Sequence, residues 1–570
     1  MSTRSAVGSR SPSQGGVMQR LARRVRATGW VLLAATAAQL GVSDSTEAKP
    51  RPQLAVLASL PPTPREDLRE LPLRSPRLGR LQAQLHALVN SSTLRRLRVG
   101  VMVRDAYSGA ELFSQSADSP FNPASNTKII TTAAALSVLG ADFRYRTALL
   151  SPAAAAEAIG SREDGVLTGD LFVQGSGDPS LTPAGIEELA RSLARLGVRR
   201  IEGDVRLDGQ VRSLDELVAS GGAAAAYGGG GLLLSRDSYT VRIEPGSAGG
   251  GASVRLEPAS PYFVLHNRVR TVRGKRSRVS VDHSRRDDHL EVTVTGRIGT
   301  QRHRLSVRKK LVDSSAWAVA TLHRALSDLG ITVSGAVRVG PPPSGPLRVL
   351  AEHRSAPLSD ICRVVNKDSN NFVAEVVWKT LGAARFGLPG TLEKGARAAA
   401  EWLAPMGIDP ARVHLVNGSG LTYENRLRPR DLSQLLFQLY HDLDLGPELL
   451  QSLAVGGIDG TIKGRFRGGS VGLVRAKTGT LNSVSVLSGY VGTHPGALVF
   501  TIFVEGFRGR RLTAVRQAQA RIVEELLRFV RSDEQLAPAV PSVPLVPAPP
   551  GPESPESPEN KDDPDDEDAA

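Results

Sequence analysis

Three short motifs contain the residue types that acyl transfer through a serine requires. Ser125-Asn-Thr-Lys128 places a hydroxyl and an amine three residues apart, on one face of any helix that begins there. The amine can accept the hydroxyl proton if burial or a neighbouring cation lowers the pKa of the amine. Ser369-Asn-Asn371 and Lys477-Thr-Gly-Thr480 follow later in the chain. The first motif therefore predicts a nucleophilic serine with a lysine beside it, and no metal-binding His-Glu-x-x-His pattern occurs in the sequence.

Each motif has a simpler interpretation when it is taken singly. Ser369 and Asn371 could cap a helix, because Ser and Asn are preferred there, and Lys477 to Thr480 could form an ordinary turn. Ser306-Val-Arg-Lys309 repeats the spacing of the first motif, but it lies in an alternating basic stretch that predicts a strand. Residues three apart on a strand face opposite sides, so this second copy is excluded.

The order of the three motifs is that of penicillin-binding proteins and serine β-lactamases. From about residue 97 to 505 the chain resembles the D-alanyl-D-alanine carboxypeptidase/endopeptidase family, the low-molecular-mass class C penicillin-binding proteins. The stretches that carry this resemblance are Asn122 to Lys128, Gly175 to Leu181, Asn366 to Asn371 with Ala374-Glu375, Gly418 to Leu421 with Asn425-Arg426, Gly457 to Thr461 and Lys477 to Leu481. The 244 positions from Ser125 to Ser369 agree with the extra domains that this family carries there.

Two stretches depart from the family pattern. The chain reads Asn417-Gly-Ser-Gly-Leu-Thr422 where the family has Asp-Gly-Ser-Gly-Leu-Ser, and it differs again from Gly228 to Ser235. Both departures lie outside the three motifs. We therefore expect them to affect which substrate side chains the protein prefers, and not the chemistry of acyl transfer.

The resemblance implies a catalytic role for most of the motif residues. Ser125 would attack the carbonyl carbon of the penultimate D-alanine, and Lys128 would act as its general base when neutral. Ser369, supported by Lys477, would relay a proton to the departing amine. Asn371 would hold a substrate amide and the Lys128 amine.

The resemblance also implies a binding site for the terminal carboxylate of the peptide, or for that of a β-lactam, at Lys477, Thr478, Gly479 and Thr480. The tetrahedral intermediate needs an oxyanion hole, and its expected donors are the backbone N–H groups of Ser125 and Thr480. No metal or other cofactor is expected. β-Lactam antibiotics would act as covalent inhibitors.

The periodicity of apolar residues predicts the elements that position these motifs. Residues 97–115 predict a β-hairpin, and residues 125–139 predict a helix that Gly140 ends. Further helices are predicted at 371–385, 393–405, 431–442 and 511–531, strands at 471–476, 483–492 and 497–504, and short β-like runs throughout 165–345. With the resemblance, these elements predict an α/β fold: a transpeptidase domain like that of penicillin-binding proteins and serine β-lactamases, in which helices flank an antiparallel sheet, with a helical subdomain and a β-rich insertion.

We expect five segments along the chain. Residues 1–48 predict a signal peptide, because arginines precede an apolar run, Trp30 to Val42, that is too short to span a bilayer. Residues 49–78 predict a Pro- and Arg-rich linker, and residues 533–570 a disordered tail that is Pro-rich and acidic. A discontinuous catalytic domain would occupy 79–145 and 350–532, around a β-rich insertion of two subdomains at 146–349.

Composition limits the classes of function. Cys362 is the single cysteine, which excludes an internal disulfide and a thiolate metal cluster, and we expect it to be a buried structural thiol. The formal net charge is +14, although the last twenty residues carry nine acids and one lysine, so the body of the chain is strongly basic. A basic body favours an anionic partner. The signal segment and the aromatic content of 4% argue against nucleic acid as that partner.

The favoured function is that of a serine DD-carboxypeptidase or DD-endopeptidase. It would act on D-Ala–D-Ala stem peptides, or on D-Ala-linked cross-links, of peptidoglycan through an acyl-enzyme on Ser125. The protein would be exported to the periplasm or cell envelope without a transmembrane anchor. Two alternatives stay open, a serine β-lactamase with fast deacylation and a non-catalytic wall-binding scaffold of the same fold. The sequence does not separate the carboxypeptidase from the endopeptidase, and it does not predict the oligomeric state or the base for deacylation.

Overall fold

The computed structural model describes residues 75–159, 164–208, 232–286, 289–311, 314–493 and 496–534. The predicted signal peptide, most of the predicted linker and the predicted tail from residue 535 onward lie outside the described residues. All of the described residues belong to one of the two units into which the chain divides, Asp67–Ala570. Among the helices described, none is both long enough and apolar enough to cross a membrane.

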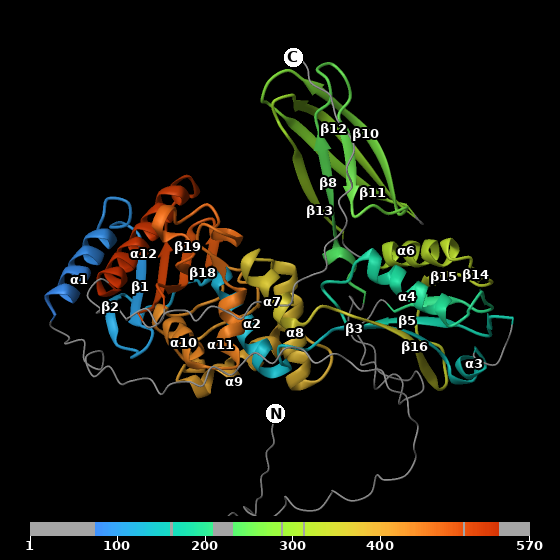
Figure 1. Ribbon diagram of the computed structural model, residues 1–570, viewed down its shortest axis with the longest axis horizontal. Coiled ribbons are helices and arrows are strands. Elements are labelled where there is room, and N and C mark those ends of the chain that lie inside the picture. The colour runs from blue at the N-terminus through green and yellow to red at the C-terminus, as the bar shows by residue number, and fades with distance from the viewer. Residues whose placement is uncertain are drawn as a thin grey trace, which may run out of the picture. The chain divides into compact units, whose positions relative to one another are not determined.

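A six-stranded antiparallel sheet carries the Lys477 motif. Its strands lie in the order β17 (Ala454–Val455), β18 (Val474–Leu481), β19 (Val484–Val491), β20 (Leu498–Glu505), β1 (Arg98–Asp105) and β2 (Glu111–Gln115) (Figure 1). Every residue of β19 is buried, as is all of β20 except its last residue. A strand loses the alternation of buried and exposed residues when both faces of its sheet are covered. This sheet is therefore the middle layer of the region that holds the motifs.

Helices cover both faces of this sheet. On one face lie α1 (Pro76–Val89) and α12 (Leu512–Glu534), which contact each other and share one apolar core with the strands (Figure 1). On the other face α10 (Pro429–His441) contacts β1 and β20. The remaining helices of this region are α2 (Thr127–Leu139), α7 (Leu358–Lys367), α8 (Asn371–Phe386), α9 (Leu392–Leu403) and α11 (Leu445–Ser452). The helices predicted at 125–139, 371–385, 393–405, 431–442 and 511–531 are confirmed to within three residues at each end.

Two local expectations need correction. The strand predicted at 471–476 begins at Val474 and continues to Leu481, so the Lys477 motif lies inside the strand and not at its end. The helix α1 begins at Pro76, within the segment predicted as linker. Ser75 caps this helix by accepting a hydrogen bond from the Leu78 N–H, and proline at the first helical position has the backbone angle that a helix needs.

The described residues between 146 and 354 form four further sheets. The largest has the order β15 (Val337–Val339), β7 (Val205–Leu207), β5 (Leu171–Gly175), β3 (Arg146–Pro152) and β16 (Leu347–Arg354). A second sheet has the order β14 (Thr332–Val333), β6 (Arg200–Ile201) and β4 (Val166–Leu167). A third has the order β10 (Phe263–Val272), β12 (Leu290–Gly299) and β11 (Arg278–Arg285). The fourth has the order β13 (Leu305–Lys310), β8 (Ser238–Glu244) and β9 (Ser253–Glu257). The α-helices described in this segment are α3 (Ala153–Ala158), α4 (Pro183–Arg195) and α6 (Ser315–Asp328).

The chain enters and leaves this segment through one antiparallel strand pair. Arg146 at the start of β3 lies opposite Arg354 at the end of β16. The apolar clusters separate at the same place. Two of them consist of residues between 148 and 351, and the other four consist of residues up to 145 or from 358 onward.

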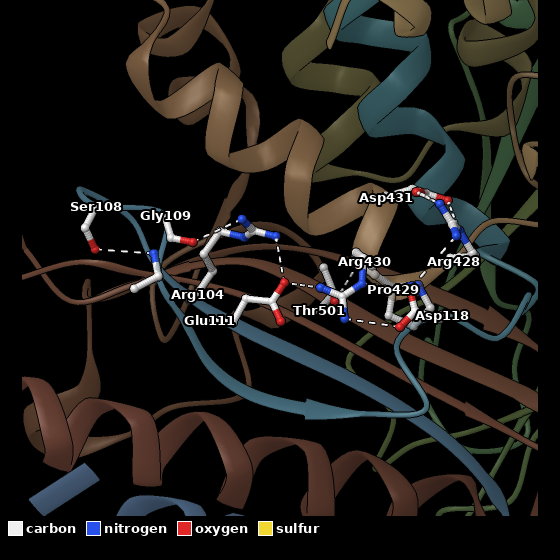
Figure 2. Close-up of polar contacts among 11 residues, drawn as sticks. Arg104, Ser108, Gly109, Glu111, Asp118, Arg428, Pro429, Arg430, Asp431 and Thr501 are labelled. Atoms are coloured by element: carbon white, nitrogen blue, oxygen red, sulfur yellow. Dashed lines mark hydrogen bonds and ion pairs between the residues drawn. The ribbon is translucent and has the colours of Figure 1, made fainter. Parts of the chain in front are cut away.

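A network of charged side chains attaches α10 to the β1–β2 hairpin. Figure 2 shows the Arg430 guanidinium between the Glu111 and Asp118 carboxylates, with its Nε donating to Asp118 Oδ1 at 2.7 Å. Arg428 pairs with Asp431 inside the first turn of α10, and its Nε donates to Asp431 Oδ2 at 2.7 Å. This network holds the N-terminal end of α10, the helix that packs against β1 and β20.

Candidate active site

Ser125 lies at the beginning of the helix that its motif predicts. The 3-10 turn η2 (Ala124–Asn126) leads directly into α2. From Phe121 to Leu136, Ser125 is the one residue that is not buried. Ala124 has a φ of +44°, a left-handed conformation that is uncommon for a residue with a side chain. The Asn122 side chain holds this turn by accepting a hydrogen bond from the Ala124 N–H at 2.7 Å.

The Lys128 amine has three partners, and one of them is the Ser125 hydroxyl. Lys128 Nζ lies 3.0 Å from Ser125 Oγ and 2.7 Å from Asn371 Oδ1, and it also contacts the backbone oxygen of Ser419. The side chain is fully buried. The structure therefore brings the first two sequence motifs together at one nitrogen atom, along with a loop that neither motif contains.

The environment of Lys128 favours the neutral amine. Burial lowers the pKa of Lys128 to about 7, although the Glu375 carboxylate acts in the opposite direction. A neutral amine has two N–H donors and one lone pair. The oxygens of Asn371 and Ser419 can only accept hydrogen bonds. Both N–H groups are therefore committed to these oxygens, and the lone pair is left for the hydroxyl proton of Ser125.

Ser369 connects the second motif to the third. Lys477 Nζ donates to Ser369 Oγ at 2.8 Å and to the backbone oxygen of Thr478 at the same distance. Ser369 has a φ of +56°, and it lies in a short turn between α7 and α8 where Asn370 caps the second helix. Burial, followed by the positive charge of Lys128, holds the pKa of the Lys477 amine well below its usual range.

The rest of the third motif lies along β18 and has other partners. Thr478 Oγ1 donates to Thr461 Oγ1 at 2.8 Å. Gly479 is buried, and a Cβ at this position would lie 2.9 Å from the backbone oxygen of Pro123. The close neighbour of Gly479 in the structure is therefore the turn that presents Ser125.

Glu375 and the loop from Gly418 to Gly420 are parts of the site to which the sequence analysis assigned no role. The Glu375 carboxylate accepts hydrogen bonds from the Gly418 N–H at 3.3 Å and from the Ser419 N–H at 3.2 Å. Gly420 has a φ of +72°, and a Cβ there would lie 1.8 Å from the backbone oxygen of Ala124. Only glycine allows this approach. The sequence signal for Glu375 and for this loop was the family resemblance, because Ala374-Glu375 and Gly418 to Leu421 are among the stretches that carry it.

Arg516, which contacts Thr480, and Arg465, which is affected by the charge of Arg516, were also missed. Arg516, on α12, donates through Nη2 to Thr480 Oγ1 at 3.1 Å. Burial, followed by the positive charge of Arg516, lowers the pKa of Arg465 to about 10. Thr480 therefore lies in a positively charged environment, which suits a carboxylate ligand. Nothing in the sequence near the motif indicates Arg516, because α12 begins more than thirty residues after Thr480.

Two further sequence predictions can be compared with the structure. Ser306 and Lys309 lie on the strand β13, as expected for the copy of the motif that was excluded. Cys362 is fully buried in α7, which confirms the structural thiol. Cys362 and Ser369 do not share a helix, because α7 ends at Lys367 and Ser369 has a positive φ.

Known proteins resemble the chain over most of its length. A sequence model of the D-Ala-D-Ala carboxypeptidase 3 (S13) family matches residues 81–526. The D-alanyl-D-alanine carboxypeptidase of Actinomadura sp. (strain R39) is 32% identical over 464 residues, which cover 78% of this chain and 84% of that protein. The D-alanyl-D-alanine carboxypeptidase DacB of Haemophilus influenzae is 27% identical over 67% of this chain and 80% of its own length.

A solved structure confirms the predicted fold. The crystal structure of penicillin binding protein 4 (dacB) from Haemophilus influenzae, complexed with a novel β-lactam, has a TM-score of 0.58 and 24% identity. The match covers 80% of this chain and 99% of that one. The match to the family model and the relative from Actinomadura identify the chain as a member of the D-Ala-D-Ala carboxypeptidase 3 (S13) family.

Proposed function

We propose that the protein is a serine DD-carboxypeptidase or DD-endopeptidase whose nucleophile is Ser125. Its substrates would be D-Ala–D-Ala stem peptides, or D-Ala-linked cross-links, of peptidoglycan. The observation that carries this proposal is the hydrogen bond between Lys128 Nζ and Ser125 Oγ, with the other two contacts of the amine made to oxygens that only accept. Membership of a D-Ala-D-Ala carboxypeptidase family supports the choice of substrate.

Acylation follows from the geometry of these groups. Ser125 Oγ bonds to the carbonyl carbon of the penultimate D-alanine while its proton passes to the neutral Lys128 amine. The backbone N–H groups of Ser125 and Thr480 are the proposed donors to the oxyanion. The bond from carbon to nitrogen then breaks, and the departing amine takes the proton that Lys128 received from Ser125, relayed through the Ser369 hydroxyl, which accepts a hydrogen bond from Lys477.

Substrate binding uses the polar edge that β18 presents. Lys477, Thr478 and Thr480 would bind the terminal carboxylate, and Arg516 contributes positive charge through its hydrogen bond to Thr480. Water then attacks the acyl-enzyme, which releases the shortened peptide as a carboxylate and restores the Ser125 hydroxyl. A β-lactam would acylate the same serine, as its ring amide takes the place of the D-Ala–D-Ala bond.

The test is intact-protein mass spectrometry after brief incubation with benzylpenicillin, with Ser125→Ala as the control. A lasting penicilloyl adduct on the wild type alone is expected. Consumption of the drug without a visible adduct would indicate the β-lactamase alternative. If the wild type neither forms an adduct nor consumes the drug, the scaffold alternative stands and the proposal is wrong.

We further propose that the protein is exported to the periplasm or cell envelope. The arginines and the short apolar run in residues 1–48 support export, and a peptidoglycan substrate requires it. The mass of the mature protein purified from cell-envelope fractions checks this point. A mature chain that still begins at Met1, recovered from the cytoplasm, would contradict it.

A further inference from the structure

A cavity of about 500 Å³ lies beside the second sequence motif. Part of its wall is the turn between α7 and α8, and the other part comes from the inserted segment. The lining residues are Asp368, Ser369, Asn370, Asn371 and Phe372 from the turn, and Arg236, Ser238, Arg308 and Lys310 from the insertion. The insertion therefore contributes three cationic side chains to a space that adjoins the candidate active site.

Strand pairing explains how two of these cations reach the cavity together. In the antiparallel pair of β13 and β8, Lys310 lies opposite Ser238 and Arg308 lies opposite Thr240. Residues two apart on a strand point to the same face. Both Arg308 and Lys310 are exposed, so their charges face the cavity and solvent and are not part of the core.

The third cation, Arg236, is held by a turn of unusual backbone conformation. Ser235, Arg236 and Asp237 all have left-handed φ angles, of +52°, +60° and +46°. Such angles are unfavourable for residues with side chains, and they persist where the surroundings enforce them, often at functional sites. Here Ser314 Oγ donates to Asp237 Oδ1 at 2.6 Å, and the Ser235 N–H donates to the backbone oxygen of Leu181 at 2.8 Å.

The charges that line the cavity are not balanced. Asp368 is the one acidic residue in the lining. Within the described part of the chain, Arg236, Arg308 and Lys310 form no ion pair with an acidic side chain. Burial, followed by the positive charge of Arg308, lowers the pKa of Arg236, and the Asp368 carboxylate acts in the opposite direction. One carboxylate faces three cations, and an anion bound in the cavity would offset the excess positive charge.

We propose that this cavity binds a carboxylate on the departing segment of the substrate, the part released when the acyl-enzyme forms. This inference rests on the proposed function, in which Ser369 passes a proton to the departing amine. Ser369 contacts Lys477 and also lines the cavity. A side chain of the departing residue that extends past Ser369 would therefore enter the space lined by the three cations. The terminal carboxylate stays at Lys477, Thr478 and Thr480, so the cavity recognises a second, separate anionic group.

The experiment compares peptides whose departing residue differs by one charge. N-acylated D-Ala–D-Glu and D-Ala–D-Gln keep the same terminal carboxylate and nearly the same size. A second pair, with D-2-aminopimelate or its side-chain amide in the departing position, covers a longer reach. For at least one pair, we expect the acid to exceed the amide in kcat/KM by about tenfold in the wild type, as for one charge-assisted hydrogen bond.

Two variants locate the source of that preference. Arg308→Gln combined with Lys310→Gln should bring the ratio of acid to amide close to one. Arg304→Gln is the matched control, because this exposed arginine precedes the same strand but does not line the cavity. It should keep the wild-type ratio.

The outcomes separate this inference from the proposed function. Acylation of the wild type by benzylpenicillin decides the proposed function and does not depend on the cavity charges. If the wild type is acylated but shows no preference for the acid in either pair, or if the double variant keeps the preference, the inference is overturned. Retention of the protein on a polyphosphate column that the double variant loses, with no peptide preference, would assign the cations to an anionic wall polymer instead.

Discussion

The protonation state of a single amine sets the pH at which Ser125 can react. Lys128 accepts the Ser125 proton only as the neutral amine, and burial lowers the pKa of Lys128 to about 7. The rate of acylation should therefore rise as the pH increases through about 7 and become constant above it, with the rate at pH 6 about one-tenth of the plateau. The measurement is the second-order rate constant for acylation by benzylpenicillin from pH 5.5 to 9.

The Lys128→Arg variant is the control for this pH profile. A guanidinium keeps its proton throughout this range, so acylation should fall by at least about a hundredfold at every pH. Circular dichroism would check that the variant folds. A wild-type rate that rises only above pH 9 would show that Lys128 stays charged at neutral pH, and the assignment of Lys128 as general base would then fail.

Glu375 acts on the same profile through a second route. Its carboxylate raises the pKa of Lys128. It also accepts hydrogen bonds from the N–H groups of Gly418 and Ser419, and these bonds hold the loop whose Ser419 backbone oxygen contacts Lys128. In Glu375→Gln the charge is lost, so the rising limb of the pH profile should move to lower pH. The plateau should also fall, because the amide can accept from the loop but its NH₂ group opposes the second N–H.

Glu424→Gln provides the comparison for this variant, since Glu424 is an exposed acid on the same loop. Its pH profile should match that of the wild type. If the acylation rate of Glu375→Gln has a lower plateau but the same midpoint pH as the wild type, the role of Glu375 is purely structural. If the pH profile does not change at all, Glu375 has no role in acylation.

At the scale of elements, the charged network at α10 contains one strong ion pair and several weak ones. The Asp431 side chain is 5% exposed and pairs with Arg428, which is 14% exposed, whereas the Asp118 side chain is 62% exposed. Asp431→Ala should lower the free energy of unfolding by about 2 kcal/mol, because it leaves a partly buried guanidinium without its main partner. Asp118→Ala should cost less than about 1 kcal/mol.

Thermal unfolding of the two variants beside the wild type would test this ranking. Added salt should reduce the effect of Asp118→Ala more than that of Asp431→Ala, because exposed pairs are screened. Equal destabilisation by the two variants would mean that burial does not determine the strength of this network.

Local patterns predicted most of the elements that carry the motifs. The helix after Ser125 and the strands β19 and β20 follow from periodic or continuous apolar residues, and their predicted bounds agree closely with the structure. The order of the three motifs, with the family resemblance, selected Ser125, Lys128 and Ser369, and the structure places each of them in hydrogen bonds with other motif residues. The helix α1 was missed because proline and arginine dominate the segment before it, although Ser75-Pro76 is a helix-start signal.

The remainder depends on tertiary contacts that no local pattern contains. Arg516 reaches Thr480 from the last helix, and Arg236 and Arg308 reach the turn of Ser369 from an inserted segment. The left-handed angles of Ser369 and Arg236 also lack a sequence signal, because glycine is the residue that ordinarily marks such positions. Residues that are distant in sequence and act on the same ligand can be found only when the fold is known.

At the scale of the whole molecule, we propose that the catalytic part and the insertion are separate folding domains. Among the residues that the structure describes, no apolar cluster joins the two sides of the strand pair at Arg146 and Arg354. On this basis the boundary lies near residue 355, a few residues later than the 349 expected from sequence, because β16 pairs with β3 up to Arg354. The N–H of Ser355 donates to the backbone oxygen of Tyr145, and this hydrogen bond lies next to the strand pair on the catalytic side.

Excision of the insertion tests this division. Joining Arg146 to Arg354 through Asn-Gly suits an antiparallel pair, because a two-residue turn links strands at this spacing. The shortened protein should fold, and benzylpenicillin should acylate it at a rate within about tenfold of the wild type, because every group that contacts Ser125 or Lys128 is retained. It should also lose any preference for an anionic departing residue, since Arg236, Arg308 and Lys310 are removed. A shortened protein that unfolds, or that folds but cannot be acylated, would show that the insertion supports the site and is not an independent domain.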